Sequence, residues 1–145
     1  MPTVAEQEVT LLDTSAAVAL VLEDHRDHTE TRRGLSGATL GLCGYAAFET
    51  YSVLTRLPAP ARRTPGAAMR LIERNFPATC FLPEDESARL LAQLGALGVT
   101  GGSVYDALVG ACARAHRRPL ASRDRRALEV YLSLGVELRP IGSSS

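Results

Sequence analysis

The sequence predicts a single α/β domain with a central, mostly parallel sheet of about five short strands flanked by helices. Short apolar runs alternate along the chain with segments of helical periodicity, a pattern typical of parallel sheets covered by helices. The 145 residues, 46% hydrophobic and 22% charged, suffice for one core but not for two. We expect one domain over residues 9–141, a polar tail over residues 1–8 and a second tail over residues 142–145.

The first half of the domain is predicted from its apolar spacing and from the residues that begin or end each element. Thr14 or Ser15 can cap the apolar helix that follows the first strand. Pro58 stops the third helix, and Thr64-Pro65 suits the cap and first turn of the next one. In order, we expect a strand at 9–12, a helix to about residue 22, a solvated helix ending near residue 34, a strand at 39–42, a helix at 45–57 and a helix from residue 64.

The second half follows the same alternation of strands and helices. Acidic residues fill the first turn of the helix from Glu84, where they complement the helix dipole. Gly101-Gly102 breaks the chain before the next helix, and Gly135 ends the last one. In order, we expect a strand at 78–82, a helix at 84–97, a helix at 103–116, a strand at 119–122, a helix at 124–134 and a strand at 136–138.

Several classes of protein lack support in this sequence. No apolar run approaches the roughly 18 residues that span a bilayer, and the polar N-terminus does not resemble a signal peptide. Cys43, Cys80 and Cys112 are odd in number and widely spaced, which fits reduced, buried thiols. Nucleotide-binding glycine motifs and the G-x-S-x-G elbow are missing. We therefore expect a cytoplasmic protein without membrane contact.

Four acidic residues stand where strand and helix ends should bring them together. Asp13 directly follows the first strand and Asp124 the fourth, and the carboxyl ends of parallel strands share one crevice. Asp106 lies three residues into its helix, and Glu49 follows Phe48 on a helix face expected to pack toward the sheet. Converging carboxylates repel one another unless a cation neutralises them. Hard oxygen ligands suit Mg²⁺ or Mn²⁺ rather than Zn²⁺.

Each acid also has a purely structural interpretation. Asp13 and Asp124 can be helix caps, Asp106 can form a capping pair with Ser103, and Glu49 can be a solvated carboxylate. Asp13 nevertheless interrupts the apolar segment VTLLDTSAAVALVL, where burial of an unpaired carboxylate would be costly. Because no Cys or His is well placed as a nucleophile, the acids indicate metal-assisted hydrolysis.

Four segments place the acids in a distinctive order: LLDTSAAVALVL, FETYSVLTRL, VYDALVGACARAH and PLASRDRRALEVYLSLGVEL. These segments resemble PIN-domain proteins and, among these, the VapC toxins. The resemblance covers residues 9–141 and keeps the four acids in the family's order. It implies that Asp13 and Asp106 are the principal metal ligands and that Glu49 and Asp124 complete the site directly or through water. Supporting hydroxyl groups are expected at Thr14 and Ser122.

The resemblance also implies an activity and its partners. Family members are metal-dependent endoribonucleases that use Mg²⁺ and are inhibited by a cognate antitoxin protein. They usually form homodimers, and operator DNA is contacted only through the antitoxin. The resemblance therefore implies that RNA is the substrate. Mn²⁺, which also suits oxygen ligands, is expected to substitute for Mg²⁺.

RNA binding requires cations, although the formal net charge of the chain is zero. All 16 basic residues are arginines, whose planar guanidinium groups suit phosphate. The C-terminal third is richer in arginine than in acids, and we expect Arg123 to lie nearest to the four acids. Solvated surface arginines remain the alternative. The candidates are Arg114, Arg117, Arg118, Arg123, Arg125 and Arg126.

Two other functions remain open at this point. One is a catalytically silent PIN-fold module that only binds other proteins, although the presence of all four acids argues against it. The other is a Mg²⁺-dependent phosphohydrolase of a small molecule. Residues 13–15 read Asp-Thr-Ser rather than Asp-x-Asp, which argues against the aspartyl-phosphate type.

Overall fold

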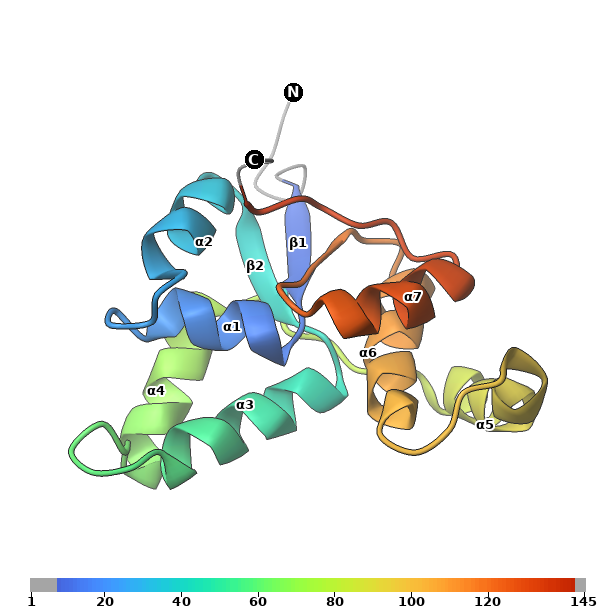
Figure 1. The fold of residues 1–145 in the computed structure, drawn as a ribbon, viewed down its shortest axis with the longest axis horizontal. Coiled ribbons are helices and arrows are strands. Elements are labelled where there is room, and N and C mark those ends of the chain that lie inside the picture. Colours follow the sequence, from blue (N-terminus) through green and yellow to red (C-terminus); the bar gives the residue numbers. More distant parts are fainter. Residues whose placement is uncertain (1–7, 143–145) are drawn as a thin grey trace.

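The computed structural model describes residues 8–142, in which a small parallel sheet is surrounded by helices (Figure 1). The sheet contains β1 (Val9–Leu12), β2 (Thr39–Leu42) and β3 (Leu120–Ala121) in the order β2-β1-β3, and both pairings are parallel. The predicted α/β fold class is therefore confirmed. Residues 1–7 and 143–145, which include most of the two predicted tails, lie outside the described residues.

The helices begin and end close to the predicted positions. Thr64 caps the fourth helix by accepting a hydrogen bond from the backbone N–H of Ala67, as its position predicted. Of the caps considered for the first helix, Asp13 is the N-cap, whereas Thr14 and Ser15 are not. In the described part of the chain the helices are α1 (Thr14–Val21), α2 (His28–Gly34), α3 (Tyr45–Arg56), α4 (Pro65–Asn75), α5 (Glu84–Leu97), α6 (Ser103–Ala115) and α7 (Arg125–Ser133).

Two of the five expected strands are reduced to single bridges at the edges of the sheet. Cys80 forms an isolated parallel β-bridge with Cys43 through backbone hydrogen bonds. Leu138 forms another with Leu120. The first segment cannot extend its ladder regularly, because the Thr79 hydroxyl rather than a backbone carbonyl accepts the hydrogen bond from the N–H of Leu42. The prediction of about five strands is thus corrected to three strands among residues 8–142, flanked by two short extended segments.

The sheet separates two hydrophobic clusters because successive strand residues point to opposite faces. Leu11 and Leu120 belong to the cluster that contains buried residues of α6 and α7. Leu12, Leu42 and Ala121 belong to the cluster packed against α1, α3 and α4. Figure 1 shows these two groups of helices on opposite sides of the strands. None of the helices within residues 8–142 has the length and apolar character needed to cross a membrane.

Residues 78–80, called the Cys80 segment below, lie directly beside β2, and this close approach gives a testable prediction. A Cβ atom at Gly41 would lie 2.2 Å from the backbone oxygen of Ala78, so Gly41→Ala must displace backbone. We expect this variant to lower the free energy of unfolding by about 2–3 kcal/mol in urea denaturation. Gly95→Ala is the control, because its Cβ meets nothing within 4 Å and alanine favours its helix. Equal stabilities of the two variants would contradict the constraint at Gly41.

Candidate active site

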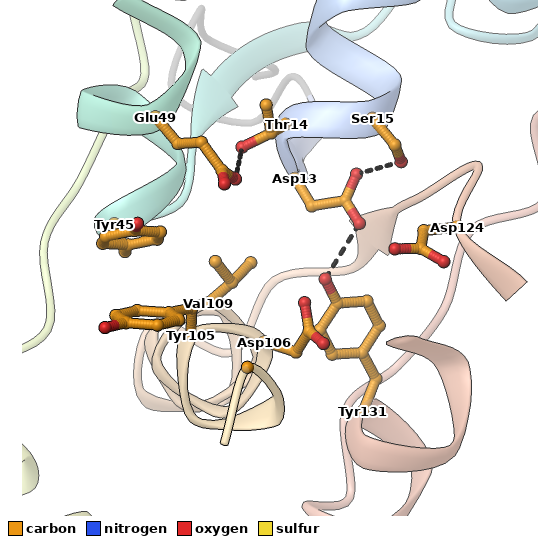
Figure 2. A pocket seen from close by; sticks show the side chains of 11 residues that line it. Asp13, Thr14, Ser15, Tyr45, Glu49, Tyr105, Asp106, Val109, Asp124 and Tyr131 are labelled. Carbon is orange, nitrogen blue, oxygen red and sulfur yellow. Dashed lines mark hydrogen bonds between the residues drawn. The ribbon is translucent and has the colours of Figure 1, made fainter. Parts of the chain in front are cut away.

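The four predicted acids line one pocket at the carboxyl ends of β1 and β3. Asp13, Glu49, Asp106 and Asp124 contribute to its wall, and its volume is about 290 Å³. Figure 2 shows their carboxylates spread around a common space, with Asp13 at the centre and Glu49 and Asp124 on either side. Residues separated by more than a hundred positions are therefore neighbours here, as the strand-end argument predicted.

Four helices begin at this pocket. Thr14 is the first residue of α1 and Tyr45 the first residue of α3, while Gly102 and Asp124 are the N-caps of α6 and α7. The backbone N–H groups at a helix N-terminus carry partial positive charge. They offset part of the repulsion among the acids, and they also favour a phosphate group close by.

Asp13 is the most enclosed acid, with only 4% of its surface exposed. Its Oδ1 accepts hydrogen bonds from the Ser15 hydroxyl at 2.7 Å and the Ala16 N–H at 3.1 Å, and its Oδ2 accepts one from the Tyr131 hydroxyl at 2.8 Å. Burial raises the pKa of Asp13, and hydrogen bonds from Ser122 and these three donors oppose that rise. The donors also fix the direction of both carboxylate oxygens.

Glu49 and Asp124 are oriented by hydroxyl and backbone groups. The Thr14 hydroxyl donates to Oε1 of Glu49 at 2.5 Å. Asp124 caps α7 by accepting from the N–H of Arg126 at 3.0 Å, and its own N–H donates to the Ser122 hydroxyl at 3.0 Å. The helix-cap interpretation of Asp124 is thus correct, and it is compatible with a position at the pocket.

Asp106 differs from the other acids because its carboxylate accepts no hydrogen bond from any residue in 8–142. Partial burial raises its pKa to about 6, and the negative charges of Asp124, Asp13 and Glu49 contribute to that rise, while Arg126 lowers it. A cation in the pocket would act in the opposite direction. The donor set, four carboxylates around one pocket, fits Mg²⁺ or Mn²⁺.

Two expectations about individual acids are corrected. The N-cap of α6 is Gly102 and no side chain caps that helix, so Ser103 and Asp106 do not form the capping pair considered above. Phe48 does not pack toward the sheet, since 68% of its surface is exposed. Glu49 faces the pocket, and neighbouring helical residues point about 100° apart, which turns Phe48 outward beside Phe81.

The guanidinium of Arg123 is directed away from the four acids, although its backbone N–H donates to the Ser15 hydroxyl at 2.8 Å. Its guanidinium pairs with Asp27 at 3.3 Å and Glu30 at 2.6 Å, and only 19% of its side chain is exposed. This engagement argues against a contact with RNA. The Arg126 side chain is 97% exposed, with Nε 3.9 Å from Asp124. Of the remaining candidates, Arg114 donates to the Leu134 carbonyl, whereas Arg117, Arg118 and Arg125 are exposed.

Three tyrosines and a serine at the pocket were missed by the sequence analysis. Tyr45 and Tyr105 stack with ring centroids 4.8 Å apart, and Tyr131 and Ser15 hold Asp13. Helical periodicity predicts that Tyr131 faces the core, and a buried tyrosine hydroxyl needs a partner. Its partner Asp13 is 118 residues away, so no local pattern could identify it.

The raised pKa of Asp106 predicts a pH-dependent effect on stability. Its folded-state pKa of about 6 exceeds the ordinary value of 3.8, so its charge destabilises the fold as pH rises through that window. We expect Asp106→Asn to be more stable than the wild type by about 1 kcal/mol at pH 7 in EDTA, after allowance for solvent screening. The difference should vanish near pH 4. Urea denaturation at both pH values would measure it, and equal stability at pH 7 would contradict the repulsion.

Comparison with known proteins identifies relatives of this chain. The PIN domain family model matches residues 10–132. The Mycobacterium tuberculosis protein named Ribonuclease VapC27 is 41% identical over 127 residues, which is 88% of this chain and 93% of that protein. This level of identity across nearly the whole of both chains establishes common family membership.

Solved structures agree in fold. M. tuberculosis VapC20, described as a toxin that cleaves the sarcin-ricin loop, has a TM-score of 0.66 at 19% identity and covers 90% of this chain and 99% of its own. VapBC2 of Rickettsia felis, solved with a DNA fragment from its promoter, has a TM-score of 0.63 at 12% identity and covers 90% and 96%. The chain belongs to the PIN domain family and, within it, groups with the VapC ribonucleases.

Proposed function

We propose that this chain is a metal-dependent endoribonuclease and the toxin of a VapBC-type toxin–antitoxin pair. The observation that carries the proposal is the convergence of four carboxylates on one pocket where four helices begin. The name of the 41% identical relative VapC27 supports ribonuclease activity. A pocket of this negative charge would repel an RNA phosphate unless a cation lies between them, which supports metal dependence.

Mg²⁺ is the ion that these oxygen ligands would take, with Mn²⁺ as a substitute. Asp13 and Asp106 would be the principal ligands, since Asp13 is held rigidly by its donors and Asp106 is free of hydrogen bonds from residues 8–142. Glu49 and Asp124 would complete the site directly or through water. When bound, the ion would polarise the phosphodiester and lower the pKa of water.

The side chains around the ion would position the attacking water. Glu49 and Asp124 flank the pocket, so either carboxylate can orient the water and take its proton. Thr14 engages Oε1 of Glu49, which leaves Oε2 for this role, and Ser122 steadies Asp124 through its backbone N–H. Hydrolysis by direct attack of water would leave a 5′-phosphate and a 3′-hydroxyl.

The rim of the pocket carries groups suited to an unpaired stretch of RNA. Tyr105 is half exposed and stacks on Tyr45, so its ring can support an unstacked base. Arg125 and Arg126 begin α7 at the pocket and can contact phosphates. Arg117 and Arg118 follow the opposite end of α6, so a contact there would require a longer RNA.

The toxin role would require a cognate antitoxin protein. We propose that a segment of this partner covers the acidic pocket and presents a cation to the carboxylates. The chain would form a homodimer and contact operator DNA only through the antitoxin. The R. felis VapBC2 complex bound to a fragment of its promoter supports an association of such a pair with operator DNA, by analogy of fold.

Cleavage of RNA tests the proposed activity directly. The purified antitoxin-free chain, incubated with total bacterial RNA and Mg²⁺, should produce discrete cuts that EDTA abolishes. Asp106→Asn should reduce cleavage at least about a hundredfold, because it removes a proposed ligand of the ion. Mapping of 5′ ends and gel analysis would measure the products.

Asp85→Asn is the matched control for this experiment. Asp85 lies in the exposed first turn of α5, outside the pocket, and its substitution should leave cleavage unchanged. Induced expression in bacteria gives a second readout, in which the wild type but not Asp106→Asn should arrest growth. Full activity of folded Asp106→Asn, or activity that persists in EDTA, would disprove the proposed mechanism.

Tyr131→Phe tests the support of Asp13. Loss of the hydroxyl removes one donor from a buried carboxylate, which should lower stability by about 1–2 kcal/mol. It should also raise the pKa of Asp13 further, because that hydrogen bond lowers it. The acidic limb of the kcat/KM profile should therefore move to higher pH. Tyr51→Phe, outside the pocket, should leave the profile unchanged, and an unshifted profile for Tyr131→Phe would exclude this positioning role.

A further inference from the structure

Cys80, Cys112 and His116 form a second cluster, apart from the acidic pocket. The two sulfur atoms are 3.9 Å apart, and these atoms and a ring nitrogen of His116 all lie within 4.8 Å of one another. No other three His, Cys, Asp or Glu residues among 8–142 gather their ligand atoms so closely. The expectation of separate buried thiols is thus incomplete, because Cys80 and Cys112 are in contact.

The fold places these side chains together through two different elements. Cys112 and His116 are four residues apart at the end of α6, so they lie on one face of the helix. Cys80 lies in the segment that bridges the end of β2, where the N–H of Gly44 donates to its carbonyl at 2.8 Å. A Cβ at Gly44 would be 3.5 Å from the Cys112 sulfur, so the chain passes directly beside this thiol.

The separation of the two sulfur atoms matches that expected in a tetrahedral metal site. Two thiolates bound to zinc at about 2.3 Å each are about 3.8 Å apart, close to the sulfur separation in this structure. A hydrogen bond between two thiols would give a similar distance, and the imidazole beside them is what favours a metal. Nε2 of His116 is 2.8 Å from the Phe81 carbonyl, and such a contact commonly orients a metal-binding histidine.

We propose that Cys80, Cys112 and His116 bind one soft divalent cation of the zinc class, with water in the fourth position. Thiolate and imidazole ligands select such an ion, whereas the carboxylate pocket suits Mg²⁺, so the two sites differ in metal preference. Cys43 stays outside the site, because it is fully buried and its thiol donates to the Val109 carbonyl at 3.0 Å. The bound ion would tie the end of α6 to the Cys80 segment.

Without an ion, both thiols carry their protons at neutral pH. Binding therefore releases two protons. Cys112 is six residues from Asp106, which is about 9 Å along α6. The bound ion would therefore stabilise the fold rather than take part in hydrolysis.

Cobalt titration distinguishes this site from the carboxylate pocket. The metal-free, full-length chain carrying Asp106→Asn, kept reduced with a non-thiol reductant, would be titrated with Co²⁺. One equivalent should produce a near-ultraviolet sulfur-to-cobalt charge-transfer band, which oxygen ligands do not give, and one equivalent of Zn²⁺ should remove it. Cys80→Ser should weaken the band by about half or more, and His116→Gln should lower the affinity at least tenfold.

His25→Gln in the same background is the matched control and should behave like its parent. Circular dichroism would verify that each variant is folded, and the half-buried His116 at a helix end should tolerate substitution if Cys80→Ser does not. Absence of the charge-transfer band with stoichiometric Co²⁺ would overturn the proposal. An unchanged affinity in folded His116→Gln would also overturn it.

Discussion

The structure depends on holding a buried carboxylate, Asp13, between two halves of the molecule. A carboxylate taken out of water must receive hydrogen bonds, or its burial costs more than the fold can offset. Its donors come from the start of α1 and from Tyr131 in α7, which pack on opposite faces of the sheet. The acid is therefore satisfied only when both hydrophobic clusters are assembled around the strands.

In this fold, two of the residues that cap helices also place negative charge at the pocket. Asp13 caps α1 and Asp124 caps α7, so the side chains that begin the helices also line the pocket. The structural and functional interpretations of these two residues do not compete. Asp106 is different, since it caps nothing and gains no hydrogen bond within residues 8–142, and its position has no evident benefit for the metal-free fold.

Local sequence patterns predicted what depends on neighbours along the chain. The first two strands, the helices and the convergence of four acids at the strand ends follow from periodicity and chain direction. Features set by distant partners could not be predicted in this way. The Thr79 hydroxyl interrupts an edge strand, Arg123 pairs with acids of a remote segment, and Cys80 meets Cys112 across 32 positions. A periodic pattern shows which face is buried but not what covers it.

The distance in sequence between Asp13 and Tyr131 has a consequence for synthesis of the chain. A ribosome makes the first of these residues 118 positions before the second, and Asp124 also comes late. A growing chain that lacks α7 has neither the last acid of the pocket nor the hydroxyl that holds the first. Synthesis of the last helix is therefore the step that completes both the ring of acids and the hydrogen bonds of the most buried acid.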